Sequence, residues 1–568
     1  MMTTRRLRLA RVAGAIGRTA LVAAALTLTT QTAVAAPSDH LCALPDSGKG
    51  RPEGAGPLKR NGQRQVLPLA PRRVVKVGCR WPADVRAIVL TPGSIRLQSG
   101  GRVVRQISIG NGGAIHLDRI AQLVGSGKWL ARGANGVIEL RAPLVQRPGS
   151  RLAITAPRVR TVRLVDNRYV HLGGEGASVL IKGVTITSRA RGESGPDTKP
   201  KNGRPFIFYE NGSRLDIVNS TISFLGSDRS NGYGISWKNG STGVVKHSTF
   251  ERNFFGIYTN RARDIIFRDN TIRFNDLYGW DPHDFSTGLV FERNVVHGNG
   301  SHGIIVSNGV RNSVIRGNRS FDNEGNGIVI DKGSPRNLVE GNVVKRNADG
   351  IVLLDSPDNR VVANEVTGNQ VGVRVNGKRS KRNVLRRNNL TDNQIGVQAY
   401  RGAARLNAAG TQISGGDIGM ALDAPNSQVV DITVTGARLG IELRRPAVAR
   451  RLNISGAEVG LRDDGMARKR NLSGLIAAEK VGIRQRGFAF PVGNAVTIDA
   501  PRPVVNEITL NEQPPSYLWW LPLAGMFFIA SAVLIELLRS RREKGRAVRA
   551  ARHARRLADG PTPDGLRR

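Results

Sequence analysis

The chain has 568 residues, with 85 Lys+Arg against 44 Asp+Glu and a formal net charge of +41. A charge of this size opposes folding by self-repulsion, so it points to an anionic partner: nucleic acid, anionic lipid or an acidic polymer. Hydrophobic residues make up 40% of the chain, which excludes a wholly disordered protein.

The first 36 residues have the organisation of a secretory signal peptide. Several arginines precede an apolar run over residues 20–28, and the small residues 33–35 resemble a cleavage site. Because the apolar run is shorter than the ~20 residues that a membrane span needs, we expect cleavage near Ala35 or Ala36 rather than a permanent anchor. A Pro/Gly-rich, basic lead-in follows over residues 37–72.

Residues 517–538 are predicted to form a single C-terminal transmembrane helix. The stretch is apolar except for Ser531 and Glu536, and tyrosine and tryptophan stand at its start. A Pro-containing spacer, 501–516, precedes it. The basic tail that follows, 539–568, should be cytoplasmic by the positive-inside rule, so the folded part would lie outside the cytoplasm, at the cell surface or in the periplasm.

The net charge is divided unevenly between the ends and the exported part. Residues 1–36 carry five arginines and no acid, and residues 539–568 carry eleven Lys+Arg against three acids, which leaves +28 of the +41 elsewhere. Anionic inner-leaflet lipid accounts for the charge of the tail. Export argues against nucleic acid, so the remaining charge favours an acidic polymer as the partner.

The only two cysteines, Cys42 and Cys79, lie close to the expected mature N-terminus. Export favours a disulfide between them, with free thiols as the alternative. Their spacing lacks the CxxC pattern that would favour a metal site.

A glycine followed by an apolar residue recurs every 20–24 residues in the second half of the exported part. The glycines of this register are Gly234, Gly256, Gly279, Gly303, Gly327, Gly350, Gly372, Gly396, Gly419, Gly440, Gly460 and Gly482. Asparagines keep the same interval in two further registers, Asn270, Asn294, Asn318, Asn342, Asn364 and Asn388, then Asn275, Asn299, Asn323, Asn347, Asn369 and Asn393. The interval is too short for a propeller blade and lacks a leucine or helical pattern.

Short strands with Gly and Asn at the corners favour the coils of a parallel β-helix, because both residues tolerate positive φ. Coils stack about 4.8 Å apart, so equivalent asparagines can form side-chain ladders. We predict an all-β, right-handed parallel β-helix (solenoid) over 73–500, the hand being that of known coils of this length. A β-sandwich with chance glycine spacing is the alternative. The part up to Arg189 is expected to be less regular, and residues 190–206 to be a loop insertion.

One coil departs from the repeat, at residues 277–284, LYGWDPHD. Two carboxylates, an imidazole and a phenol lie within seven residues, which favours acid–base catalysis. Only one histidine is present there, so no metal site is predicted. The 24-residue interval brings the following coils to the same face, which would then carry Tyr278, Asp281, His283, Asp284, His302, Asn308, Asp331 and Lys332. The alternative is that these side chains only satisfy turns, with Lys332 solvated.

The segment YGWDPHD, with FGIYTNRARD before it and HGIIVS after it, resembles the signature of the mannuronan (alginate) C5-epimerase family, Tyr-Gly-x-Asp-Pro-His-Asp/Glu on a right-handed parallel β-helix. The resemblance is close over residues 254–400. It implies an isomerase that removes the proton α to a uronate carboxylate and returns one to the opposite face. It also implies an anionic polysaccharide as substrate and no required cofactor, although some members use Ca²⁺.

The resemblance also implies roles for individual residues. His283 would be the general base, Asp281 and Asp284 would orient the imidazole or the substrate, and Tyr278 or a water would donate the second proton. The remaining residues are expected to bind substrate: Trp280, His302, Asn308 and Asp331.

Two features depart from the alginate-export branch of that family. Asn308 stands where that branch has an arginine thought to neutralise the substrate carboxylate, and Lys332, one coil further, is expected to take over this role. The predicted membrane anchor suggests that the protein acts on a polymer as the polymer emerges at the membrane, beside exopolysaccharide synthesis or export machinery. A noncatalytic polysaccharide-binding protein and a polyuronate lyase remain alternatives.

Overall fold

The structure is a computed structural model that describes residues 85–464, except 111, 167–169, 201–202 and 228–231, together with strands over 472–485, 488–491 and 496–498. The predicted signal peptide, Cys42, Cys79 and the predicted transmembrane helix 517–538 lie outside these residues. Within the described part of the chain, no helix is both long enough and apolar enough to span a bilayer.

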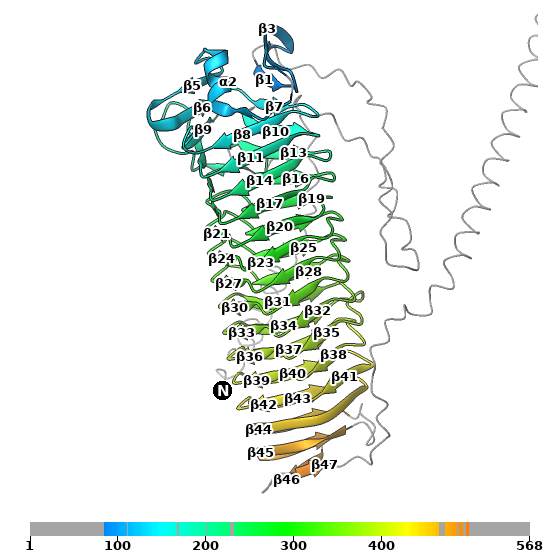
Figure 1. Ribbon diagram of the computed structural model, residues 1–568. Helices are drawn as coiled ribbons and strands as arrows, with labels where there is room; N and C mark the ends of the chain where they lie inside the picture. Colours follow the sequence, from blue (N-terminus) through cyan, green and yellow to red (C-terminus); the bar gives the residue numbers. More distant parts are fainter. Residues whose placement is uncertain are drawn as a thin grey trace, which may run out of the picture. The chain divides into compact units, whose positions relative to one another are not determined.

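The described residues form a parallel β-helix in which each coil contributes three short strands. A strand pairs in parallel with the strand three places further along the chain, so the coils stack into three long sheets (Figure 1). The predicted parallel β-helix is therefore confirmed. The first sheet consists of β7 (Leu144–Gln146), β10 (His171–Glu175), β13 (Phe206–Glu210), β16 (Ile235–Lys238), β19 (Ile257–Asn260), β22 (Trp280–His283), β25 (Ile304–Ser307), β28 (Ile328–Asp331), β31 (Asp349–Leu354), β34 (Val371–Asn376), β37 (Ile395–Tyr400), β40 (Ile418–Leu422) and β43 (Leu439–Leu443).

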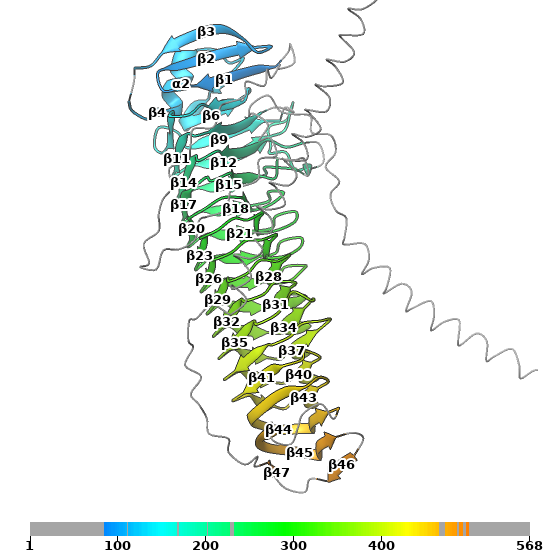
Figure 2. The same cartoon turned by 90° about the vertical axis from the view of Figure 1, so that its right-hand side faces the viewer.

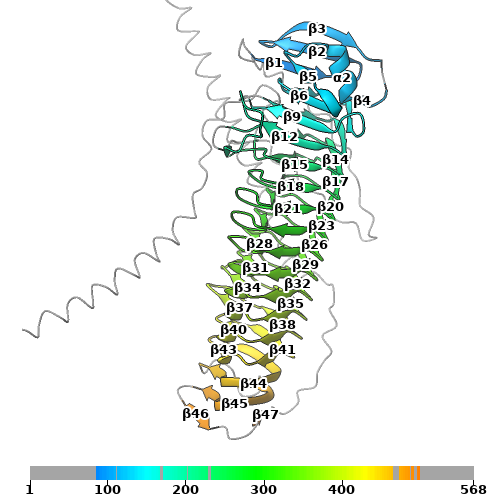
Figure 3. The same cartoon turned by 90° about the vertical axis from the view of Figure 1, so that its left-hand side faces the viewer.

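The other two sheets follow the same order along the stack (Figure 3). The second sheet consists of β8 (Arg151–Thr155), β11 (Ser178–Lys182), β14 (Arg214–Val218), β17 (Gly243–Lys246), β20 (Ile265–Arg268), β23 (Val290–Glu292), β26 (Val314–Arg316), β29 (Leu338–Glu340), β32 (Arg360–Val362), β35 (Val384–Arg386), β38 (Asn407–Ala409) and β41 (Ser427–Val430). The third consists of β9 (Thr161–Val165), β12 (Thr185–Arg189), β15 (Thr221–Ser223), β18 (Thr249–Glu251), β21 (Thr271–Arg273), β24 (Val295–His297), β27 (Arg319–Phe321), β30 (Val343–Lys345), β33 (Glu365–Thr367), β36 (Asn389–Thr391), β39 (Gln412–Ser414) and β42 (Thr433–Thr435).

The core of the β-helix lies inside the coils and is built by side-chain alternation. In β25 and β28, Ile304 and Val306 stack on Ile328 and Ile330, and all four are fully buried. Successive residues of a strand point to opposite faces, so every second residue is apolar and points inward. The residues between them, Ile305 and its partners, lie on the outer face.

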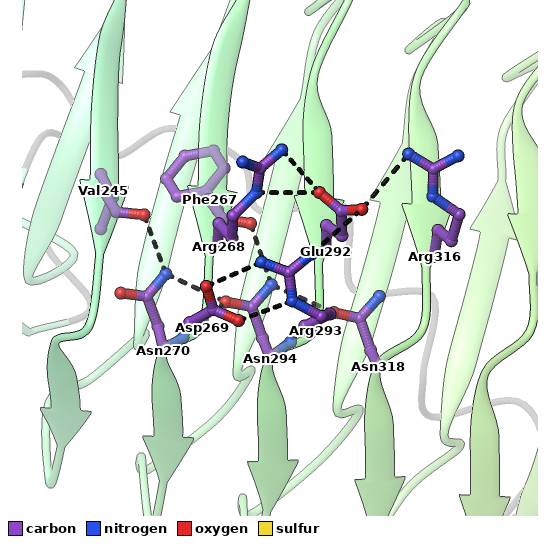
Figure 4. Close-up of polar contacts among 10 residues, drawn as sticks. All are labelled: Val245, Phe267, Arg268, Asp269, Asn270, Glu292, Arg293, Asn294, Arg316 and Asn318. Atoms are coloured by element: carbon purple, nitrogen blue, oxygen red, sulfur yellow. Dashed lines mark hydrogen bonds and ion pairs between the residues drawn. The ribbon is translucent and has the colours of Figure 1, made fainter.

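Asparagine ladders close the two corners that flank the third sheet. At one corner, Asn294 Nδ2 donates to Asn318 Oδ1 at 3.0 Å and to the carbonyl of Phe267 at 3.0 Å, and Asn270 and Asn318 repeat the pattern (Figure 4). A second column, which includes Asn253, Asn275 and Asn299, does the same at the other corner. These side chains supply the buried turn with partners for its backbone groups, which burial makes costly to leave unpaired.

The N-terminal part is less regular than the coils, and differs from them in topology. Three antiparallel strands and a helix precede the first stacked coils (Figure 2). The elements are β1 (Arg86–Leu90), β2 (Ser94–Ser99), β3 (Arg102–Ser108), β4 (Ile115–His116), α2 (Leu117–Val124), β5 (Leu130–Arg132), η1 (Ala134–Gly136) and β6 (Val137–Leu140). The helix buries Leu117, Ile120 and Val124 against the core. Such a cap covers apolar surface that an open coil would expose.

The described chain continues beyond β43 with two long strands, β44 (Ala447–Asp463) and β45 (Leu472–Gln485), and two short ones, β46 (Phe488–Pro491) and β47 (Val496–Ile498). β45 pairs in antiparallel fashion with β46 and β47, unlike the coils before it.

The predicted loop insertion, 190–206, falls between β12 and β13, and its last residue, Phe206, is the first of β13. The structure describes 190–200 and 203–205 of this connection. Arg204 anchors its end: the buried guanidinium pairs with Asp276 and donates to the carbonyls of Gly226, at 2.8 Å, and Arg252, at 3.1 Å. The loop is thus tied to the coil that leads into the irregular segment 277–284.

Candidate active site

Strand β22 divides the irregular segment between the inside and the outside of the β-helix. Trp280 is fully buried in the core, where its ring stacks on Phe291 with centroids 4.1 Å apart. Its neighbour Asp281 pairs in register with Tyr258, and His283 with Asn260, on the outer face of the first sheet. The prediction that Trp280 binds substrate is wrong, because alternation along the strand points it away from that face.

A tight turn after β22 folds Asp284 back onto His283. Asp284 and Phe285 both have positive φ, 44° and 63°, and the amide and hydroxyl of Ser286 donate to the carbonyl of His283. This geometry places Asp284 Oδ1 2.9 Å from His283 Nδ1. The pair is an imidazole held in orientation by a carboxylate, as general acid–base catalysis requires.

Two amides from the neighbouring coils hold the Asp284 carboxylate in place. Asn260 Nδ2 donates to Asp284 Oδ2 at 2.6 Å, and Asn308 Nδ2 donates to Asp284 Oδ1. Asn308 therefore supports the carboxylate that orients His283. Its amide is committed to Asp284, so Asn308 acts through positioning of the pair.

The protonation behaviour of the pair follows from these contacts. Burial alone would lower the pKa of His283, but the hydrogen bond to Asp284 and the charges of Asp281 and Asp284 raise the pKa above its usual range. Burial would raise the pKa of Asp284, whereas contact with His283 and the two amides holds that pKa well below its usual range. Asp284 therefore stays ionised, and His283 keeps its proton to higher pH than an ordinary histidine does.

Asp281 is the most perturbed carboxyl of the cluster. It is only 4% exposed although it stands on the outer face. Burial raises the pKa of Asp281 to about 7, with the charges of Asp284 and Asp331 adding to the increase and those of His283 and Lys332 opposing it. A carboxyl with this pKa can hold or release a proton near neutral pH, which is typical of functional sites.

Lys332 and Asp331 approach the pair from two coils further along. The amide of Gly309 donates to the Lys332 carbonyl at 3.2 Å, so Lys332 occupies the turn position equivalent to Asn308, as predicted. Its charge lowers the pKa values of both His283 and Asp281. Asp331 is largely buried, with Oδ2 3.4 Å from Ser307 Oγ, and burial raises its pKa.

A cavity of about 670 Å³ begins at Asn308 and Lys332 and continues over the next coils. Its lining also includes Lys378, Arg379 and Arg401, with Asp355 as the single carboxylate among the lining residues. The excess of cations makes this cavity suited to a polyanion.

Tyr278 and His302 lie at the other end of the strand. Their rings stack with centroids 5.5 Å apart and an interplanar angle of 6°, and His302 Nδ1 accepts a hydrogen bond from the amide of Asn326 at 2.9 Å. Burial lowers the pKa of His302 to about 4, so this ring is neutral at physiological pH. Burial raises the pKa of Tyr278, which keeps the phenol protonated.

The preceding coils contribute residues that the sequence interpretation missed. The Tyr258 and His283 ring centroids are 6.2 Å apart, and Lys238 Nζ lies 5.6 Å from the Tyr258 centroid. Burial lowers the pKa of Lys238 to about 8 and raises that of Glu210 to about 7. The glycine register contained a signal, because the 23-residue step from Gly256 to Gly279 also relates Tyr258 to Asp281.

Within the described residues, no group of three or more His, Cys, Asp or Glu side chains is arranged to hold a metal ion.

The fold and the cluster define a class: a parallel β-helix with an acid–base site on one outer sheet. Two family models match parts of the chain, one described as right handed beta helix region over residues 169–319, and one as periplasmic copper-binding protein (NosD) over residues 283–408. The right-handed winding predicted for the coils agrees with the description of the first family model.

The chain is similar to mannuronan C5-epimerases from several bacteria. It is 34% identical over 249 residues to that of Pseudomonas aeruginosa, covering 40% of this chain and 45% of the relative, and 32% identical over 257 residues to that of Pseudomonas putida, covering 42% and 49%. The mannuronan C5-epimerase AlgG of Azotobacter vinelandii is 34% identical over 274 residues, covering 45% and 52%. The predicted resemblance to this family is confirmed, and the chain spans about half the length of these relatives.

A solved structure has the same fold. The periplasmic alginate epimerase AlgG aligns over 61% of this chain and 83% of its own, with a TM-score of 0.51 and 24% identity. This likeness supports the β-helix architecture on which the site is built.

Proposed function

We propose that this protein is a C5-epimerase of a uronate-containing, alginate-like polysaccharide. The observation that carries the proposal is the His283–Asp284 pair on the outer face, with Asp281 beneath it and Lys332 within electrostatic reach. The similarity to mannuronan C5-epimerases gives the same reaction class.

In the proposed reaction, neutral His283 removes the C5 proton, which is acidic because it lies α to the uronate carboxylate. The electron pair moves onto the carboxylate, where Lys332 stabilises the enediolate-like charge. Asp284 stabilises the imidazolium that forms. Tyr278, Tyr258 or a water returns a proton to the opposite face of C5. His283 then loses its proton to solvent, and the tyrosinate or hydroxide left by the donor regains one from solvent.

The polymer class follows from charge. The cavity next to the pair carries Lys332, Lys378, Arg379 and Arg401, which suits repeated carboxylates. The net positive charge of the exported part would draw such a polymer toward the surface. The reaction requires no cofactor in this proposal, and chelation of divalent cations, including Ca²⁺, should leave turnover unchanged.

The proposal includes an extracytoplasmic β-helix tethered through residues 517–538, beside exopolysaccharide synthesis or export machinery. The apolar, aromatic-flanked sequence of that segment supports this part. Its test is membrane fractionation: the full chain should require detergent for release, and a chain ending at residue 500 should not.

The absence of charge at Asn308 favours a second candidate, a polysaccharide-binding protein without turnover. A lyase would share the proton abstraction and then eliminate the C4 substituent. Incubation with polymannuronate in deuterated water separates the three. Deuterium at C5 in chains of unchanged length supports the epimerase, a new 4,5-unsaturated end supports the lyase, and retention on a polyuronate column without either product supports binding alone.

A further inference from the structure

The turn after the strands of the first sheet has, in six coils, two consecutive residues with positive φ. The pairs outside the catalytic coil are Asn211–Gly212, Asn239–Gly240, Asn308–Gly309, Lys332–Gly333 and Arg401–Gly402. Glycine fills the second place in each of these because it has no Cβ to clash there. In the catalytic coil, the second place is Phe285, with φ of 63°.

The backbone of Phe285 is strained, and the side chain is not buried deeply enough to offset the energy of that strain. A bulky residue with positive φ is disfavoured, and the Phe285 side chain is 44% exposed. Its ring lies over Gly309 of the next coil, where an added Cβ would come 2.5 Å from Phe285 Cδ1. A strained, exposed aromatic that a glycine-sized gap accommodates points to a use outside the fold itself.

Phe285 is close in the chain and in the packing to both parts of the candidate site, the His283–Asp284 pair and the cationic cavity. Phe285 directly follows Asp284, which contacts His283. The residue before Gly309 is Asn308, at which the cationic cavity begins. The Phe285 ring therefore packs on Gly309, the chain neighbour of Asn308, and Asn308 both contacts Asp284 and lines the cationic cavity.

We propose that Phe285 is a platform on which the pyranose ring next to the reacting uronate stacks. This inference rests on the proposed function. Cations attract the carboxylates but leave each sugar free to rotate about its linkages, whereas the C5–H bond must point at His283 for transfer. An aromatic face binds the C–H face of a sugar and fixes its plane, so the neighbouring sugar would set the orientation of the reacting one.

The chain offers a matched control in Phe274. This residue also has positive φ, 54°, is 46% exposed, and lies against a glycine, Gly298. It stands at a different corner, after β21, where Asp322 and Arg346 hold the equivalent positive-φ place in later coils. Phenylalanine there is one of several tolerated residues, and no residue of the acid–base pair is adjacent to it in the chain.

The test compares Phe285→Gly, Phe285→Tyr and Phe274→Gly by steady-state kinetics on polymannuronate and by thermal unfolding. Phe285→Gly should raise KM about fivefold to tenfold and lower kcat about threefold or more, because the contact that binds and orients the neighbouring sugar is lost. Its Tm should not fall, because glycine relieves the strain. Phe285→Tyr should keep the KM of the wild type, and so should Phe274→Gly.

An unchanged KM in Phe285→Gly, or an equal rise in Phe274→Gly, would overturn the platform. If the wild type binds polymannuronate without converting it, the proposed epimerase activity is refuted and the platform proposal still stands. Retention on a polyuronate column then replaces KM: earlier elution of Phe285→Gly than of Phe274→Gly supports the platform, and equal elution overturns it. A wild type that neither converts nor retains the polymer would refute both.

Discussion

Two corners of one coil show how the same repeat serves two purposes. At the corner around Asn294, the side chain repeats from coil to coil, and both its amide and its carbonyl group have partners within the ladder (Figure 4). At the turn 283–286, Ser286 has counterparts in Ser241 and Ser334, whereas His283 and Phe285 have none among the described turns of the first sheet. Charges on different coils there shift one another's pKa values. Repetition with full hydrogen bonding marks the scaffold, and irregularity with perturbed protonation marks the candidate site.

Replacing Lys332 by Met should have the largest effect on turnover. The carboxylate charge that develops in the transition state would lose its cation, and we expect kcat to fall about 10³-fold. Lys332 lowers the pKa of His283, so its removal should also move the acidic limb of kcat/KM to higher pH. The matched variant Lys378→Met, further along the cavity, should raise KM and leave kcat alone. Near-normal turnover in Lys332→Met would remove Lys332 from the mechanism.

Replacing Asp284 by Asn should lower kcat about 10²-fold, because the orienting carboxylate of the base is lost. The charge of Asp284 and its hydrogen bond raise the pKa of His283. Without them that pKa falls, so His283 stays neutral to lower pH and the acidic limb of the profile moves down. A pH–rate profile measures this shift, and a limb that moves upward would contradict the assignment of His283 as the base.

Replacing Asn318 by Ala should destabilise the fold and spare the chemistry. The change leaves the buried Phe291 carbonyl and the buried Asn294 amide without their side-chain partner, at a cost of about 2 kcal/mol in the free energy of unfolding. Denaturant titration measures it, with the exposed Asn389→Ala as the control that changes little. Loss of kcat without loss of stability would show that the ladder is part of the site.

Replacing Asp281 by Asn should stabilise the protein at pH 8 by about 1 kcal/mol. The pKa of Asp281 is raised to about 7 in the folded state, so its contribution to stability falls as pH rises from the unfolded value of about 4 through 7. An amide carries no charge to bury. Thermal unfolding at pH 5 and pH 8 should show the gain at pH 8 only, and equal effects at both would argue against a titrating Asp281.

The sequence predicted the stacking of the site because the glycine interval is constant. The 24-residue step correctly placed Lys332 at the position of Asn308. The same period could not tell which residues of β22 point outward. Trp280, which the sequence interpretation expected to bind substrate, lies in the core because side chains alternate along the strand.

Other parts of the site depend on geometry that the sequence pattern does not carry. The contact from Asn308 to Asp284 arises from the positive-φ turn, and it gives Asn308, expected from the sequence to bind substrate, a positioning contact with the acid–base pair. Lys238 and Glu210 lie in earlier, less regular coils, and only the pairing of β13, β16 and β19 brings them toward Tyr258. Burial rather than residue type sets the pKa of Asp281.

The most direct measurement of the central claim follows C5 exchange in deuterated water for the wild type and for His283→Gln. The wild type should place deuterium at C5 of polymannuronate without shortening the chain. His283→Gln should bind the polymer with similar affinity and incorporate at least about 10²-fold less deuterium, since general-base catalysis is lost. Deuterium incorporation by His283→Gln at the rate of the wild type would contradict the account.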